Sequence, residues 1–238
     1  MDLDHRVGNG TDGELSPGLT RVGRQQRQIR SQLDELTRRR RELEAAGRRV
    51  FDLSVGTPDF EPPAHVVEAL RQSAADPANW RYSLHDTDEL LADVCSYYEE
   101  RYGVGGITPD MVMSCRGTQE GLVHVCAALS NPGDVPLVPD PSYPVFQNAT
   151  LLAGARPAYY RLTAEHGFLP HLADVPADVA DAARYLIVSL PANPVGSVGT
   201  PEVYEEIIAF AREHDLVVIH DNAYSDIVFD GERGGSFL

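Results

Sequence analysis

The chain has 238 residues and 42% of them are hydrophobic, which allows one large domain or two small ones with a sizeable core. The formal net charge of -16 argues against a nucleic-acid partner, because a phosphate backbone would be repelled. All 20 residues in the Lys+Arg count are arginines, so no side chain of this sequence can form a Schiff base as a lysine does.

The N-terminal part of the chain is polar and highly charged. Residues 1–20 are rich in glycine, which predicts disorder. The segment 21–46 has apolar residues at helical spacing and predicts a helix that stops at Gly47. Its run of four arginines, 38–41, is interpreted as a solvated helix face rather than a nucleic-acid patch, because acidic residues surround it.

The rest of the chain alternates amphipathic segments with short apolar runs. We predict helices at 63–75, 86–102, 118–129, 143–152 and 200–214. We predict strands at 50–55, 111–114, 135–138, 156–160, 185–189 and 216–219, the last of them buried and ending at Asp221. This alternation indicates an α/β fold with a mostly parallel sheet and helices on both faces. We assign 21–60 to an N-terminal arm and small-domain segment, and 61–238 to a large domain.

A tight turn between a predicted strand and a predicted helix is a candidate anion site. A helix N-terminus presents free N–H groups and the positive end of the helix dipole, so Gly117, Thr118 and Gln119 could bind a phosphate there. Glycine allows a close approach, and Thr118 adds a hydroxyl donor. A purely structural turn explains this segment equally well when it is taken alone, and the Gly-Lys-Ser/Thr element of a P-loop is absent.

Further polar residues follow predicted strands, at the strand ends where ligands bind in parallel sheets. Tyr143 could stack on a planar cofactor, although a core tyrosine beside a turn is the simpler interpretation of that residue alone. Asn193 lies in an Asn-Pro turn, and Asp221 ends a strand with Tyr224 three residues later. Taken singly, each of these residues leaves its role open.

The sequence indicates neither a metal site nor a disulfide framework. The three cysteines are an odd number and form no C-x-x-C pair. The set of His214, His220 and Asp221 lacks the spacing of metal ligands, so we expect no metal. The sequence has no signal-peptide pattern and no apolar run of membrane-spanning length, so we expect no membrane partner and a cytoplasmic location.

Several short elements occur in a fixed order along the chain. They are Tyr82, Gly117-Thr118-Gln119, Tyr143, Asn193-Pro194-Val195-Gly196 and Asp221-Asn222-Ala223-Tyr224. This ordered set resembles the class I/II aminotransferases of fold type I, which use pyridoxal 5'-phosphate (PLP). The segment from Gly56 to Phe60 also resembles the N-terminal Gly-x-Pro segment of that family. Residues 221–231 look closest to the branch that contains LL-diaminopimelate, alanine and aspartate aminotransferases, and the whole resemblance covers roughly 36–238.

The resemblance implies a role for each of the matching residues. Asp221 would pair with the protonated pyridine nitrogen of PLP and keep the ring cationic. Asn193 and Tyr224 would donate hydrogen bonds to the phenolic oxygen of the ring, and Tyr143 would stack on the ring face. The turn that begins the helix at Thr118 would hold the phosphate.

The resemblance also implies how subunits are arranged and how the end of this sequence compares with that of family members. Tyr82 would reach the phosphate of a neighbouring subunit, which implies a homodimer with shared sites, and Gly56 would lie beside the substrate carboxylate. Thr87 and Ala92 stand where the family usually has Gly and Arg, a departure from its pattern after Tyr82. Family members continue beyond the position of Leu238 into a strand that carries the Schiff-base lysine, so the resemblance implies a fragment without that catalytic residue.

We therefore predict an aminotransferase that moves an amino group between an amino acid and a 2-oxo acid, with this fragment inactive by itself. Two alternatives stay open. One is a non-catalytic remnant or regulatory module that keeps the cofactor pocket. The other is a different PLP reaction on the same scaffold, catalysed by a β-lyase or a decarboxylase.

Overall fold

A computed structural model describes residues 34–53, 56, 60–229 and 234–238. The chain forms two compact units that divide between Leu84 and His85. The prediction of disorder at 1–20 lies outside the described residues. Within the described part of the chain, no helix has both the length and the apolar character needed to cross a membrane.

The described residues of the first unit include helices. A helix covers 34–45, and Gly47 follows it in the left-handed region with a φ of 74°, so the predicted helix stop is confirmed. Helix α2 spans Ala64–Ala75 and is followed by the 3-10 turn η1, Pro77–Trp80.

The second unit alternates helices with strands. Its helices are α3 (Asp88–Tyr102), α4 (Thr118–Leu129), α5 (Pro144–Leu152), α6 (Ala177–Ala182) and α7 (Pro201–Glu213). Its strands are β1 (Val135–Asp140), β2 (Ala158–Arg161), β3 (Ala183–Ser189) and β4 (Val217–Asp221). The 3-10 turns η2 (Pro109–Met111), η3 (Ala164–His166) and η4 (Leu172–Asp174) lie in the connections. The helices predicted for this unit are confirmed, with their ends shifted by two residues or fewer.

Local chemistry sets the helix ends. The hydroxyl of Thr87 accepts the Leu90 N–H at the start of α3, and Gly103 ends that helix in the left-handed region. Helix α7 begins with Pro201, a position where a missing N–H costs no intrahelical hydrogen bond.

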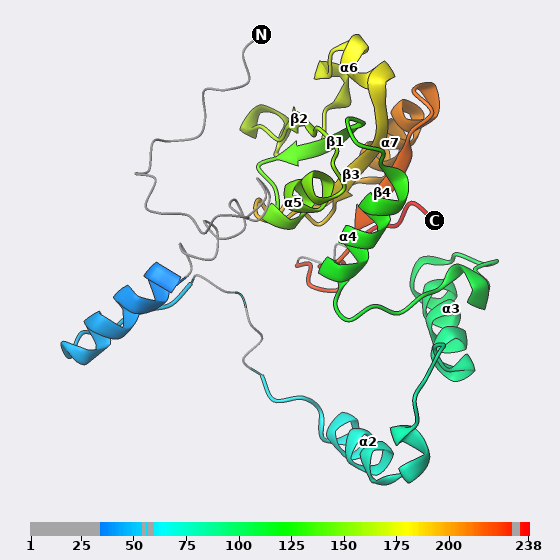
Figure 1. The fold of residues 1–238 in the computed structure, drawn as a ribbon. Helices are drawn as coiled ribbons and strands as arrows, with labels where there is room; N and C mark the ends of the chain where they lie inside the picture. Colours follow the sequence, from blue (N-terminus) through cyan, green and yellow to red (C-terminus); the bar gives the residue numbers. More distant parts are fainter. Residues whose placement is uncertain (1–33, 54–55, 57–59, 230–233) are drawn as a thin grey trace. The chain divides into compact units, whose positions relative to one another are not determined.

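The four strands form one parallel sheet in the order β2-β1-β3-β4 (Figure 1). Side chains of β3 alternate between its two faces, as the two-residue period of a strand requires. Leu186 and Val188 pack in the core cluster that includes α7, whereas Tyr185 and Ile187 pack in the cluster that includes α4 and α5. Helices therefore cover both faces of the sheet, which confirms the predicted α/β fold.

Three strand predictions need correction. The strand predicted at 50–55 is wrong over its described part, 50–53, which has no regular structure. The strand predicted at 111–114 is also wrong: Met111 and Met113 are exposed, and the N–H of Ser114 donates to the Asp86 carboxylate at 2.8 Å instead of to a neighbouring strand. Strand β4 has the predicted position, but it is half-buried rather than buried, because it lies at the edge of the sheet formed by the described residues.

Candidate functional site

The carboxyl ends of β1, β3 and β4 lie at one edge of the sheet, because the three strands are parallel neighbours. Asp140 ends β1, while Ser189 and Asp221 end β3 and β4 and are register partners. The predicted residues Tyr143 and Asn193 follow the ends of β1 and β3 within a few positions. The topology thus brings residues that are distant in sequence to a common edge.

Helix α4 begins near this edge with an open N-terminus. Gly117 precedes the helix with φ 90° and ψ 140°, a conformation that residues with a Cβ rarely adopt. The carboxylate of Glu120 accepts the Arg116 N–H at 2.8 Å, which fixes the approach to the helix. Thr118 and Gln119 are the first helical residues, and their N–H groups have no carbonyl one turn earlier. The geometry suits an anion; the binding of a phosphate stays a prediction.

Tyr143 joins the start of α4 to the end of β1. It lies at the N-terminus of α5, and its hydroxyl accepts a hydrogen bond from the side-chain amide of Gln119. Its ring packs edge-on against Phe146, with the ring centroids 5.9 Å apart. These two contacts restrain the aromatic ring beside the helix end that would bind the anion.

Asn193 and Tyr224 contact each other across the ends of β3 and β4. The side-chain amide of Asn193 donates to the Tyr224 hydroxyl at 3.3 Å. A turn supports Asn193, because the Gly196 N–H donates to the Ala192 carbonyl at 2.7 Å. Since the Tyr224 oxygen accepts this hydrogen bond, its own proton can be donated elsewhere, and the Asn193 amide keeps a second N–H. Two hydrogen-bond donors therefore lie side by side.

Asp221 is a half-buried carboxyl at the end of β4. Burial raises its pKa above the ordinary value, and a hydrogen bond from the Ala223 N–H opposes that shift. The two causes of this pKa shift, burial and the Ala223 hydrogen bond, do not include a positively charged group. A cationic group placed beside Asp221 would therefore offset the cost of burying its ionised form.

Helix α3 holds the segment that contains Asp221 and Tyr224, a role that the sequence did not indicate. The hydroxyl of Tyr97 and the guanidinium of Arg101 donate to the Asp226 carboxylate at 2.7 and 2.8 Å. The hydroxyl of Tyr102 lies 2.8 Å from the Ser225 hydroxyl and accepts a hydrogen bond from the side-chain amide of Asn222 at 3.1 Å. Residues 222, 225 and 226 are thus fixed around the two predicted ligands.

A hollow of about 320 Å³ adjoins the Asn193–Tyr224 pair. Its walls come from 191–198 and 224–229 and are mainly apolar apart from these two side chains. Asp221, Gly117 and Tyr143 are not among its lining residues, so the hollow lies next to the candidate site and does not enclose it.

The histidines weighed as metal ligands have separate partners. The ring of His220 is hydrogen-bonded to the Leu190 carbonyl at 3.0 Å, and burial lowers its pKa against the opposing effect of that bond. His214 lies 2.8 Å from the carboxylate of Asp181. Among the described residues, these histidines do not join Asp221 in a group that could hold a metal.

Gly56 and Tyr82 belong to the first unit, and both are exposed in it. Their predicted contacts with the substrate carboxylate and with the phosphate of a neighbouring subunit stay predictions.

The chain matches the family model described as aminotransferase class I and II over residues 48–236. It is 40% identical over 205 residues to the LL-diaminopimelate aminotransferase of Syntrophobacter fumaroxidans, a match that covers 86% of this chain and 53% of that protein. It is 41% identical over 192 residues to the enzyme of the same name from Moorella thermoacetica, covering 79% and 49%. The chain thus spans about half the length of these curated relatives.

Solved structures that are similar to this chain include two that are described as aminotransferases. Apo-BacF from Bacillus subtilis superposes with a TM-score of 0.81 and 32% identity, over 88% of this chain and 53% of that one. A protein from Thermus thermophilus described as a probable N-succinyldiaminopimelate aminotransferase gives a TM-score of 0.77 and 35% identity, over 83% and 53%. An alanine aminotransferase from Pyrococcus furiosus gives 0.76 and 32%, over 82% and 50%.

Proposed function

The chain belongs to the class I and II aminotransferase family, and we propose that the protein moves an amino group between an amino acid and a 2-oxo acid with PLP as its cofactor. When PLP is bound, its cationic ring takes up the electron density released at the α-carbon of the substrate. The observation that supports the proposal most strongly is that Asp221 and the Asn193–Tyr224 pair lie at neighbouring strand ends.

The polar side chains at the carboxyl edge of the sheet suit the binding of PLP. Asp221 offers a half-buried carboxylate to the pyridine nitrogen, and this pairing keeps the nitrogen protonated. The same pairing relieves the unfavourable burial of the carboxylate, so the site and the ring stabilise each other's charged form.

Asn193 and Tyr224 supply hydrogen-bond donors for an oxygen on the ring. One N–H of Asn193 is used on Tyr224, which leaves a second N–H and the Tyr224 proton. Both can be donated to a phenolic oxygen, which lowers the basicity of that oxygen and fixes the ring against rotation in its plane.

The start of α4 and the ring of Tyr143 complete the proposed cofactor contacts. The Thr118 hydroxyl and the N–H groups of Thr118 and Gln119 would hold the phosphate at the positive end of the helix dipole. Tyr143, restrained by Gln119 and Phe146, would cover one face of the ring and exclude water from it.

We further propose a cytoplasmic homodimer in which Tyr82 reaches the phosphate of the neighbouring subunit and Gly56 lies beside the substrate carboxylate. Tyr82 is 90% exposed in its unit, which leaves its hydroxyl free of intramolecular burial. A shared site of this kind predicts that cofactor affinity falls when the dimer dissociates.

LL-diaminopimelate is the first substrate to test, because curated relatives at 40–41% identity carry the name LL-diaminopimelate aminotransferase. The complete protein, incubated with PLP, this amino donor and a panel of 2-oxo acids, is expected to form a new amino acid in step with loss of the donor. Asn193→Ala is expected to weaken PLP binding and slow turnover.

The same assay distinguishes the other PLP reactions. Product that forms without a 2-oxo acid acceptor would indicate a lyase or decarboxylase in place of an aminotransferase. Unchanged PLP affinity in both Asn193→Ala and Tyr224→Phe would contradict the proposed cofactor site.

A further inference from the structure

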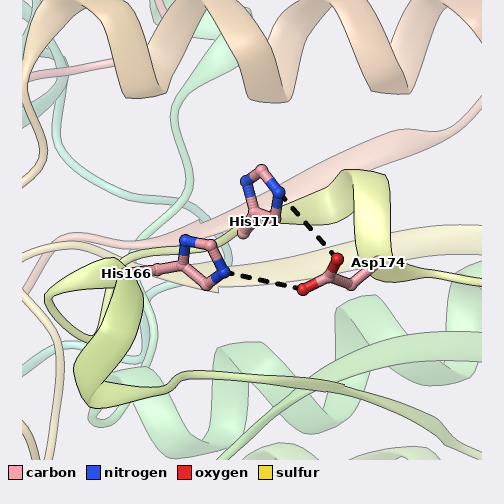
Figure 2. A group of neighbouring side chains, drawn as sticks. All are labelled: His166, His171 and Asp174. Carbon is pink, nitrogen blue, oxygen red and sulfur yellow. Dashed lines mark ion pairs between the residues drawn. The ribbon is translucent and has the colours of Figure 1, made fainter.

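Three potential metal ligands converge in the connection between β2 and α6, away from the residues that the proposed function uses. His166 ends turn η3, His171 directly precedes turn η4, and Asp174 ends turn η4 (Figure 2). One ligand atom from each of these side chains can be chosen so that all three atoms lie within 4.8 Å of one another. Figure 2 shows the Asp174 carboxylate facing both imidazole rings, with a different oxygen toward each ring.

The separations within this group match shared coordination better than hydrogen bonding. The Nε2 atom of His166 lies 3.7 Å from one Asp174 oxygen, and the Nε2 atom of His171 lies 3.9 Å from the other. Both distances exceed the usual N–H···O range of about 2.7–3.2 Å. Two ligands of one tetrahedral zinc ion, at bond lengths of about 2.0–2.2 Å, are separated by about 3.4 Å. The three ligand atoms lie within 4.8 Å of one another, so side-chain rotations that close gaps of up to about 1.4 Å would bring the three side chains onto one ion.

The two imidazole rings are stacked against each other. Their centroids lie 4.1 Å apart with an interplanar angle of 17°. Each ring has its Nε2 atom toward the same carboxylate. Because an imidazole nitrogen binds a metal in the plane of its ring, at least one of the stacked rings must rotate for both to bind one ion. His166 and His171 are partly exposed, at 32% and 39%, and Asp174 is exposed at 71%, so an ion can enter from solution.

The backbone of this connection is fixed at several points. Leu162 and Leu172 are buried in the core cluster that includes α7. The Phe168 N–H donates to the Thr163 carbonyl at 2.7 Å, and the Phe168 carbonyl accepts from the Ser197 hydroxyl at 2.8 Å. Phe168 has a φ of 57°, which a bulky residue adopts only when its surroundings hold it there. The three candidate ligands therefore lie in a connection whose backbone is held in place by these contacts.

We propose that His166, His171 and Asp174 bind one divalent transition-metal ion, with zinc as the best fit, and that water completes the tetrahedron. Two imidazole nitrogens and one carboxylate oxygen suit zinc, whereas magnesium and calcium prefer oxygen ligands alone. The ion joins turn η3 to turn η4 and stabilises the connection between β2 and α6. The spacing H-x4-H-x2-D in the sequence is the signal of this site.

Zinc titration of the untagged protein after treatment with EDTA tests the proposal. Calorimetry is expected to show one zinc ion per chain, and His171→Gln and Asp174→Asn are expected to weaken its binding roughly tenfold or more. His65→Gln is the matched control, because His65 is an exposed histidine on α2, and it is expected to bind zinc like the wild type. Asp174 is exposed, so Asp174→Asn is expected to keep the native far-UV circular dichroism.

A second measurement separates this site from zinc binding at thiols. Zinc is expected to raise the Tm of the wild type and of Cys115→Ser, but not that of the His166→Gln/His171→Gln variant, while magnesium leaves all three unchanged. The proposal is overturned if the histidine and aspartate variants bind zinc as tightly as the wild type. It is also overturned if stoichiometric binding is lost only in Cys115→Ser, whose thiol is exposed.

Discussion

Replacing Asp221 by Asn is expected to weaken PLP binding and, at the same time, to stabilise the cofactor-free protein at neutral pH. Burial raises the pKa of Asp221 and the Ala223 N–H only opposes that effect, so the ionised carboxylate costs folding free energy. Asparagine has nearly the same shape and can still accept the Ala223 N–H, but it carries no charge. A residue that served the fold alone would show the opposite effect on stability.

The size of the binding effect follows from the lost charge. A hydrogen bond between charged groups contributes about 1.5–3 kcal/mol, so removing the carboxylate is expected to weaken PLP binding about 10- to 150-fold. The stability effect has a defined pH dependence. Because the folded pKa of Asp221 lies above the ordinary 3.8, the penalty is complete above the raised pKa and disappears as the pH falls toward 3.8. The stability gain of Asp221→Asn is therefore expected to shrink as the pH falls.

Two assays check these effects on the same samples. PLP affinity is measured by fluorescence titration, and the free energy of unfolding is measured by urea denaturation without PLP at several values between pH 4 and pH 8. Asp93→Asn, an exposed substitution on α3, is the control and is expected to change neither quantity. Equal PLP affinity in Asp221→Asn, or lower stability than wild type at every pH, would refute the assignment of Asp221 to the cofactor.

Three further predictions concern the same unit. Borohydride reduction of the 238-residue chain with PLP, after its N-terminal amine is blocked, is expected to label no internal side chain, because the sequence has no lysine; a labelled peptide in mass spectrometry would contradict this. Gly117→Ala is expected to cost about 1–3 kcal/mol of unfolding free energy and to weaken PLP binding, because Gly117 has a φ of 90°; Gly105→Ala, whose φ is not in the positive range, is the control. Tyr160→Phe removes a 2.8 Å hydrogen bond to the Ile187 carbonyl in the core, and a Tm lowered by about 2–6 °C is expected; an unchanged Tm would contradict it.

The regular elements could be predicted wherever periodicity and end signals agreed. The helices α3, α5 and α7 have apolar spacing together with a cap or a proline in the first turn, and their positions were predicted within two residues. The strand predictions were wrong where an apolar run was the only signal. Residues 111–114 have such a run, but a strand also needs a neighbour for its hydrogen bonds, and a single-segment pattern carries no information about that neighbour.

The predicted part of the site depended on order along the chain. No single residue among Tyr143, Asn193 and Asp221 indicated a cofactor; PLP was implied by the resemblance of their ordered succession to the class I/II aminotransferases. Each of the three lies at or just after the carboxyl end of a strand in one parallel sheet. The zinc ligands were missed for a related reason. The spacing of His166 and His171 does not by itself predict a pair of ligands, since histidines on opposite sides of a turn have no periodicity to mark them.

The contacts from α3 explain why a list of predicted ligands does not by itself define a site. Arg101 and Tyr102 contact residues 124 and 123 positions later, so no local pattern connects them to the Asp221–Tyr224 segment. Asn222, which follows Asp221 directly, and Ser225, which follows Tyr224 directly, both have a partner in Tyr102. Displacing Tyr102 would free the backbone on either side of the ring-binding residues. The positions of Asp221 and Tyr224 in the proposed cofactor site therefore depend on α3, a helix that supplies no cofactor ligand itself.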